Sequence, residues 1–252
     1  MNININISAT PEMLGQRAAT MIAQYIRQAI EEKGCARIIL STGASQFETI
    51  AALVKEDLEW TKVEMFHLDE YVGLSESHIA SFRKYLKERF VNEIAKNPRG
   101  PLKAAHFVNG EGDVQKNIAL LTQELRSDMI DVGVIGIGEN GHIAFNDPPA
   151  DFTTDVAYKV VNLDKRCRLQ QVGEGWFKGI DDVPTQAITM CPNQIMSCKH
   201  IVTCVPHAVK AEAIFNTITQ AVTPEIPATL LKTHPDWNLF VDNASAAKLL
   251  GN

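Results

Sequence analysis

Stretches of helical periodicity alternate with short apolar runs along most of this chain, and this alternation restricts the fold more than any other feature. Apolar side chains recur at helical spacing between residues 18 and 32, and Gly34 follows at a position suited to end a helix. The next run, ARIILS at residues 36–41, is typical of a buried strand. Similar patterns predict strands over residues 62–68, 105–108, 131–136, 158–162, 200–205 and 237–241, and helices over residues 47–55, 81–95, 113–128 and 208–215.

Residues 164–172 are interpreted as a polar helix or a flap, and the chain is expected to end in a helix. Strands separated by helices of this length predict an α/β protein with a doubly wound, mostly parallel sheet and helices on both faces.

The length and composition indicate one compact domain. The chain has 252 residues, of which 45% are hydrophobic and 21% are charged, as in ordinary globular proteins and unlike disordered or collagen-like chains. No linker, repeat or low-complexity tract divides it, so we expect a single domain over residues 1–252.

Charge and hydropathy exclude several classes of partner. The net charge of −6 has the wrong sign for non-specific binding to nucleic acid or to an anionic membrane. No apolar run approaches the roughly 18 residues of a membrane span, and the first ten residues do not resemble a secretory signal. The five cysteines follow no metal-binding pattern. We therefore expect a cytoplasmic protein that binds neither nucleic acid nor a membrane.

Three segments of unusual composition directly follow predicted strands, where ligands bind in sheets of this kind. The first is STGASQ at residues 41–46. Its small and hydroxyl side chains would let backbone N–H groups and a helix N-terminus approach a phosphate. Considered alone, the loop is equally well explained as a plain turn with a helix cap.

The second segment, FHLDEYVGL at residues 66–74, places two adjacent carboxylates at the end of an apolar strand. Side chains of adjacent residues on an extended chain point to opposite sides, so at most one of Asp69 and Glu70 should face a given pocket. A partly buried carboxylate there is suited to act as a general base. Salt-bridged or helix-capping acids are the more common explanation for such a pair.

The third segment, GIGENGHIAFNDPP at residues 136–149, carries the strongest signal. Its glycines permit close backbone approach, and His142 beside an amide and near a carboxylate can move protons at neutral pH. The spacing G-x-G-x-x-G fits a dinucleotide site, but no acid ends a following strand about 20 residues later. A metal site on His142 and Asp147 lacks an evident third ligand. A structural histidine in a glycine-rich turn is the remaining alternative.

The motifs HLDEYVGL at residues 67–74 and GIGENGHIAFNDP at residues 136–148 resemble the glucosamine-6-phosphate deaminase/isomerase family, which is related to the 6-phosphogluconolactonases. STGAS at residues 41–45 and VPHAVKA at residues 205–211 fit the same pattern in the same order. The resemblance implies a Rossmann-like fold and conversion of glucosamine 6-phosphate to fructose 6-phosphate and ammonia by ring opening, enolisation and deamination. It implies a small sugar phosphate as partner and no cofactor or catalytic metal, and a homo-oligomer stays open.

Matched position by position, the resemblance implies a catalytic set. Asp69 matches the base that moves a proton between C2 and C1, and His142 matches the residue that opens the sugar ring. Asp147 stands where the family usually has a glutamate that orients the histidine, and Asn140 stands where many members have an aspartate. The substrate-binding residues expected from the motifs and the resemblance are Thr42, Gly43, Ala44, Ser45, Glu70, Gly138, Gly141, Arg168 and Lys210.

One part of the family's phosphate site has no clear counterpart. An arginine is expected after the mid-chain strand, but counting from Lys159 places Gln171 there, so Arg168 or Arg166 is the expected substitute. The surrounding segment, 163–182, contains small residues typical of hinges and is a candidate lid. An ordinary surface helix followed by a turn explains the same residues.

Three alternatives to glucosamine-6-phosphate deamination are kept. Galactosamine 6-phosphate differs from the leading substrate by one inverted hydroxyl, which the pocket must discriminate. A 6-phosphogluconolactonase-type hydrolase belongs to the same superfamily, although the segment AFNDP after His142 is unlike the lactonases. A non-catalytic sugar-phosphate sensor is suggested by Asn140 and the absent arginine.

Overall fold

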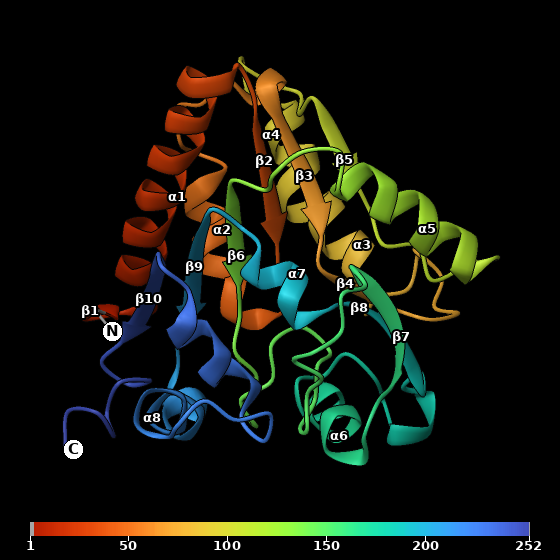
Figure 1. The fold of residues 1–252 in the computed structure, drawn as a ribbon, viewed down its shortest axis with the longest axis vertical. Helices are drawn as coiled ribbons and strands as arrows, with labels where there is room; N and C mark the ends of the chain where they lie inside the picture. Colours follow the sequence, from red (N-terminus) through yellow and green to blue (C-terminus); the bar gives the residue numbers. More distant parts are fainter. Residues whose placement is uncertain (1–2, 252) are drawn as a thin grey trace.

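Seven parallel strands form the central sheet of the computed structural model, which describes residues 3–251 (Figure 1). Their spatial order is β1-β10-β9-β6-β2-β3-β5, and every adjacent pair runs parallel. The strands are β1 Asn4–Ser8, β2 Ala36–Leu40, β3 Val63–His67, β5 Ala104–His106, β6 Val132–Ile135, β9 His200–Val205 and β10 Trp237–Asp242. Each predicted strand of this sheet is present, and β1 is an edge strand that the sequence patterns did not indicate.

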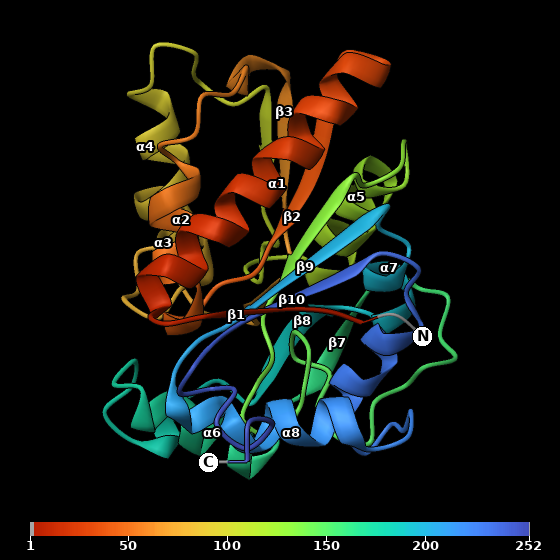
Figure 2. The same ribbon diagram turned by 90° about the vertical axis from the view of Figure 1, so that its left-hand side faces the viewer.

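Helices cover both faces of this sheet, which confirms the predicted doubly wound α/β fold (Figure 2). Along β2, Ile38 and Leu40 pack in one buried cluster and Ile39 packs in the other, because successive strand residues point to opposite faces. The first cluster includes residues of α1 Pro11–Lys33, α2 Phe47–Leu53, α3 Phe82–Leu86 and α4 Asn92–Ala95. The second includes residues of α5 Val114–Leu125, α7 Pro192–Met196 and α8 Ala211–Thr219.

Local sequence signals fix the ends of several helices. Thr10 caps α1, accepting a hydrogen bond from the Met13 N–H, and Gly34 ends it in the left-handed region at φ 80°. The predicted helix over residues 81–95 is present as α3, a π-helical turn Lys87–Val91 and α4, with Ser81 as the N-cap. Short 3-10 turns occur at Ala44–Gln46, Trp60–Lys62, Ile180–Asp182, Ala208–Lys210 and Pro227–Thr233.

A second, three-stranded antiparallel sheet lies beyond the carboxyl ends of the central strands (Figure 1). It is formed by β4 Asp69–Tyr71, β8 Gln186–Met190 and β7 Tyr158–Asn162, of which only β7 was predicted. Helix α6 Lys165–Gly173 packs beside it through a cluster that contains Tyr71, Phe145 and Phe177. The small sheet therefore fixes the position of the chain directly after β3.

The predicted C-terminal helix is wrong. Residues 243–251 form hydrogen-bonded turns instead. So short a segment has little helical stability of its own, and Ser245 bonds to Asp242 at the end of β10 rather than continuing a regular ladder.

The chain order creates a crevice between β2 and β6. These strands are neighbours, but the chain leaves β2 toward β3 on one side and leaves β6 toward β9 on the other. The loops that follow the two strands therefore diverge, and ligands in open α/β sheets bind at such a point. In the part of the chain described, no helix has the length and apolar character needed to cross a membrane.

Candidate active site

A cavity of about 190 Å³ lies at this crevice. Pockets for drug-sized ligands start near about 300 Å³, so this cavity suits a smaller molecule. Four loops that follow β2, β3, β6 and β9 surround it, together with α6. The lining residues are Ser41, Thr42, Gly43, Ala44, Ser45, Leu68, Asp69, Phe82, Gly136, Ile137, Gly138, Glu139, His142, Ala144, Phe145, Gln170, Gln171, Glu174, His207, Val209 and Lys210.

Asp69 is the carboxylate at the floor of the cavity. It is the first residue of β4, two residues after the end of β3, and it is only 6% exposed. Burial raises its pKa to about 8, and the charge of Glu70 adds to this rise. A carboxylate with a pKa near neutrality is suited to accept a proton from carbon and return it.

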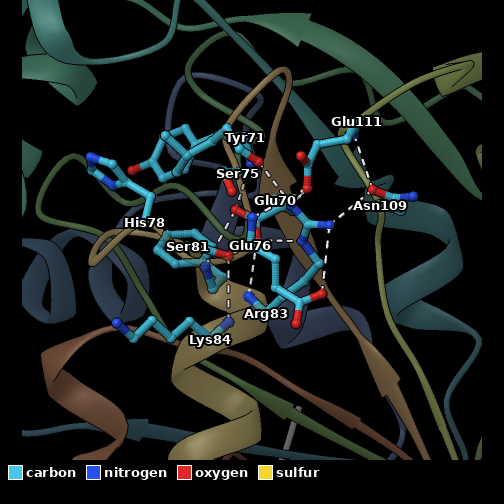
Figure 3. A network of polar contacts seen from close by, with 12 residues as sticks. Glu70, Tyr71, Ser75, Glu76, His78, Ser81, Arg83, Lys84, Asn109 and Glu111 are labelled. Atoms are coloured by element: carbon cyan, nitrogen blue, oxygen red, sulfur yellow. Dashed lines mark hydrogen bonds and ion pairs between the residues drawn. The ribbon is translucent and has the colours of Figure 1, made fainter.

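Glu70 does not face the cavity, which corrects its prediction as a substrate-binding residue. Its side chain points to the opposite side of β4, is fully buried, and accepts hydrogen bonds from Ser81 Oγ, the Arg83 N–H and the Tyr71 N–H (Figure 3). The alternation of side chains along an extended strand requires this arrangement once Asp69 faces the pocket.

His142, Asp147 and Asn140 form a connected group beside Asp69's cavity. His142 Nδ1 lies 3.2 Å from Asp147 Oδ1, which also accepts a hydrogen bond of 3.1 Å from Asn140 Nδ2. The Asn140 Oδ1 accepts a hydrogen bond from the His142 backbone N–H. Burial raises the pKa of Asp147, but its contacts with His142 and Asn140 outweigh this effect and hold the pKa below its usual value.

Of these three residues, only His142 lines the cavity. Asp147 and Asn140 contact His142 from outside the cavity, an arrangement that can orient an imidazole. Asn140 was predicted to be a catalytic residue. In the structure it does not line the cavity but contacts His142, which does.

Two predicted glycines differ in their roles. Gly138 lines the cavity beneath His142, and a Cβ there would lie 2.2 Å from His142 Cε1, so only glycine leaves room for the ring. Gly141 does not line the cavity, which corrects its prediction as a substrate-binding residue. Its φ of 82° favours glycine, and its backbone carbonyl accepts a hydrogen bond from the Ala228 N–H.

The predicted loop 42–45 and Lys210 also line the cavity. Gly43 has a φ of 98°, and a 3-10 turn that leads into α2 begins at Ala44. Lys210 is 8% exposed and belongs to the 3-10 turn after β9. Burial lowers the pKa of Lys210, and the charges of Glu174 and Glu139 partly oppose this effect. One buried ammonium beside a turn of backbone N–H groups can hold a phosphate.

The structure does not bring Arg168 to the cavity. Its guanidinium donates hydrogen bonds to the backbone carbonyls of Ile180 and Val183 and so stabilises the loop after α6. Gln171 lines the cavity instead, and its Oε1 accepts a hydrogen bond of 2.8 Å from the Tyr71 hydroxyl. Residues 168 and 171 lie only about 60° apart around a helix of 3.6 residues per turn, so helical spacing does not separate them. Their partners do: Arg168 reaches the carbonyls of the loop after α6, whereas Gln171 reaches the Tyr71 hydroxyl.

Several lining residues were not predicted from the sequence. Glu139 lies within the glycine-rich segment, and His207 lies in VPHAVKA with a φ of 80°, so both were within reach of the motifs. Phe145 lies three residues after His142 in the same segment, whereas Glu174 and Phe82 come from segments whose approach to the cavity depends on tertiary packing. In the described part of the chain, residues 3–251, no group of three or more His, Cys, Asp or Glu could hold a metal ion.

Comparison with known proteins identifies the family. The model of a family described as glucosamine-6-phosphate isomerases/6-phosphogluconolactonase matches residues 9–239. The chain belongs to this family. A glucosamine-6-phosphate deaminase of Streptococcus sanguinis (strain SK36) is 32% identical over 236 residues, 93% of this chain and 94% of the relative. A glucosamine-6-phosphate deaminase of Streptococcus pneumoniae serotype 4 is 34% identical over 218 residues, 86% and 89% of the two chains.

Solved structures agree with this assignment to the glucosamine-6-phosphate isomerase/6-phosphogluconolactonase family. A structure described as a monomeric glucosamine-6-phosphate deaminase has a TM-score of 0.86 and 30% identity, covering 97% of this chain and 99% of that chain. A 6-phosphogluconolactonase from Trypanosoma brucei has a TM-score of 0.79 at 16% identity, covering 98% and 99%, and shows the shared fold. The predicted family is confirmed.

Proposed function

We propose that this family member is a glucosamine-6-phosphate deaminase that converts glucosamine 6-phosphate and water to fructose 6-phosphate and ammonia. The observation that carries the proposal is that Asp69, His142 and Lys210 line one small cavity. The deaminase relatives at 32–34% identity support the same reaction.

Lys210 and the loop 42–45 hold the phosphate in this proposal. The ammonium supplies a charge-assisted hydrogen bond, and the backbone and hydroxyl groups of the loop supply further donors. With the phosphate held there, the sugar ring lies in the cavity that Asp69 and His142 also line.

His142 opens the ring. Its Nδ1 faces Asp147, so its Nε2 is the atom available to exchange a proton with the ring oxygen and the C1 hydroxyl. Asp147 keeps the ring orientation and stabilises the imidazolium that forms when His142 takes up a proton.

Asp69 carries out the enolisation. The ionised carboxylate takes the proton from C2 of the open-chain aldehyde and returns it to C1, which converts the aldose to a ketose-level imine. Water adds to C2 of this imine, and the resulting carbinolamine expels ammonia to leave the C2 ketone. The net change consumes one water, so the reaction is also a hydrolysis, and it needs no redox cofactor.

The segment 163–182 is proposed as the lid of this site. Three residues of α6 and the turn after it, Gln170, Gln171 and Glu174, line the cavity and separate it from solvent on that side. Closure of such a segment would exclude water from the enolic intermediate.

The proposal also covers where the protein is located and how it assembles. We propose a cytoplasmic location, which the five unpaired cysteines support, since secreted domains tend to pair theirs. A homo-oligomer remains a prediction beside a monomer.

The experiment that tests the function measures ammonia and fructose 6-phosphate released from glucosamine 6-phosphate. We expect equal amounts of both products. Galactosamine 6-phosphate and 6-phosphogluconolactone are run beside it, with the Asp69→Asn protein as the matched blank. Hydrolysis of the lactone without ammonia release from either amino sugar would contradict the proposal, and binding without any turnover would indicate a sensor.

A further inference from the structure

Behind Asp69, on the side of β4 away from the cavity, lies a buried ion pair between Glu70 and Arg83 (Figure 3). The Arg83 side chain is 5% exposed, and its Nε lies 3.3 Å from Glu70 Oε2. The other guanidinium nitrogens donate to Asn109 Oδ1 at 2.9 Å, to the Leu74 carbonyl at 2.8 Å and to Glu111 Oε2 at 2.8 Å. A buried cation with this many partners has a fixed position.

Glu70 is surrounded by donors only. Its Oε1 accepts from the Tyr71 and Phe82 N–H groups, and its Oε2 accepts from Ser81 Oγ and from both the N–H and the Nε of Arg83. A protonated Glu70 would place its own hydrogen against one of these donors. Burial raises the pKa of Glu70 above its usual value, and these donors limit the rise. The hydrogen-bond geometry itself fits the ionised carboxylate, which only accepts.

Asp69 has no comparable set of donors. Hydrogen bonds to its carboxylate are absent among the described residues, whereas burial and the neighbouring Glu70 charge both disfavour its ionised form. If the two adjacent carboxylates compete for one proton, the donors around Glu70 direct that proton to Asp69. The groups coupled to Asp69 by charge are Glu70 and Tyr71 on β4, Tyr158 on β7 and Cys167 on α6. The titratable groups that line the same cavity are Glu139, His142, Glu174, His207 and Lys210. His67 precedes Asp69 by two residues on β3, and Arg83 on α3 pairs with the neighbouring Glu70.

We propose that Arg83 is a positioning residue for the enolising base: through its ion pair with Glu70 it offsets the negative charge behind Asp69 and so keeps Asp69 able to ionise near neutral pH. This inference rests on the proposed role of Asp69 as the base. The pair also anchors the N-terminus of α3 to β4, so one buried contact fixes both the place and the charge environment of Asp69.

The proposal makes opposite predictions for the two partners of the ion pair. Arg83→Met removes the compensating charge and leaves Glu70 ionised among its backbone donors, so ionisation of Asp69 becomes harder. Glu70→Gln removes the negative charge behind Asp69, so its ionisation becomes easier. A purely structural role would lower activity in both variants without moving the ionisation midpoint in opposite directions.

The test compares the acid limb of the pH profile of kcat/KM for ammonia release. We expect the midpoint to move up by at least about half a pH unit in Arg83→Met and down by at least about half a unit in Glu70→Gln, since a unit charge near a buried group has an effect of this order. Arg83→Lys should restore most of the wild-type midpoint. The matched control is Glu111→Gln, which removes the half-exposed partner of Arg83 and should leave the midpoint unchanged.

Direct titration separates a failure of this inference from a failure of the proposed function. The carboxyl signal of Asp69 is followed by NMR in protein labelled with ¹³C-aspartate and assigned by its loss in Asp69→Asn. The expected order of midpoints without any turnover would keep the inference and overturn the function. Midpoints that do not move, or that move in the same direction in both variants, would overturn the inference. If Arg83→Met fails to fold, Glu70→Gln decides the outcome: a downward shift of its midpoint, with Arg83→Lys and Glu111→Gln close to wild type, would keep the inference, and an unmoved or raised midpoint in Glu70→Gln would overturn it.

Discussion

Asp147 Oδ1 lies 3.2 Å from His142 Nδ1 and at the same time accepts a hydrogen bond from Asn140. The carboxylate thus links the His142 imidazole, which lines the cavity, to the glycine-rich segment that carries it. Because Nδ1 faces Asp147, Nε2 is the His142 nitrogen left free to meet a substrate.

Replacing Asp147 with asparagine should therefore slow the reaction without weakening binding. Asp147→Asn keeps the shape but removes the charge that stabilises the imidazolium, and we expect kcat to fall about 10²-fold, within the usual range for acid–base catalysis. KM should change less than about threefold. The matched control is Asp155→Asn, whose exposed carboxylate lies outside the cavity; a similar loss in both variants would remove the special role of Asp147.

The buried ammonium of Lys210 should contribute to binding through the phosphate. In Lys210→Met, KM for glucosamine 6-phosphate should rise about 10- to 100-fold, which corresponds to the loss of one charge-assisted hydrogen bond. The effect should be much smaller for unphosphorylated glucosamine. Lys55→Met alters an exposed lysine away from the cavity and should behave as wild type. Equal losses on the two sugars would place the phosphate elsewhere.

The pH dependence of activity should reflect the raised pKa of Asp69. Because the base acts in its ionised form and its pKa is about 8 in the free protein, kcat/KM should rise with pH and level off above about 8. The profile is measured with saturating and limiting substrate between pH 5 and pH 10. A profile that is flat between pH 6 and pH 9 would contradict the assignment of Asp69.

The motifs predicted the loops of the site better than they predicted single side chains. The order of strands and helices followed from apolar periodicity, so the loops after β2, β3, β6 and β9 could be placed at one edge of the sheet. The strands β4 and β8 escaped this reasoning because β4 has three residues, two of them acidic, and gains its stability from pairing with a segment far along the chain.

Side-chain direction decided the predictions that failed. Glu70 and Asp69 were recognised as pointing apart, but only the tertiary structure shows that Asp69 is the one that faces the cavity. Arg168 and Gln171 lie three residues apart on α6, and sequence spacing alone did not indicate which of the two side chains reaches the cavity. The glycines 138 and 141 look alike in the motif, yet one leaves room for His142 and the other serves a left-handed backbone.

The raised pKa of Asp69 also predicts how the stability of the protein changes with pH. The pKa of Asp69 is about 8 in the folded protein, compared with 3.8 for an ordinary aspartate, so the folded state binds the proton more tightly. The contribution of Asp69 to stability is therefore present below pH 4 and is lost as the pH rises through about 8. Asp69→Asn cannot lose a proton, so its Tm relative to wild type should increase between pH 5 and pH 9. A constant difference in Tm across this range would contradict the raised pKa.

The most direct test of the central claim is turnover and binding by Asp69→Asn at pH 8. The substitution keeps the size of the side chain and removes the base, so kcat for ammonia release from glucosamine 6-phosphate should fall about 10³-fold or more, near the upper range for a general base. The Kd for the sugar phosphate, measured by calorimetry, should remain within about threefold of the wild-type value, since Lys210 and the loop 42–45 are unchanged. Turnover at the wild-type rate in this variant would contradict the account.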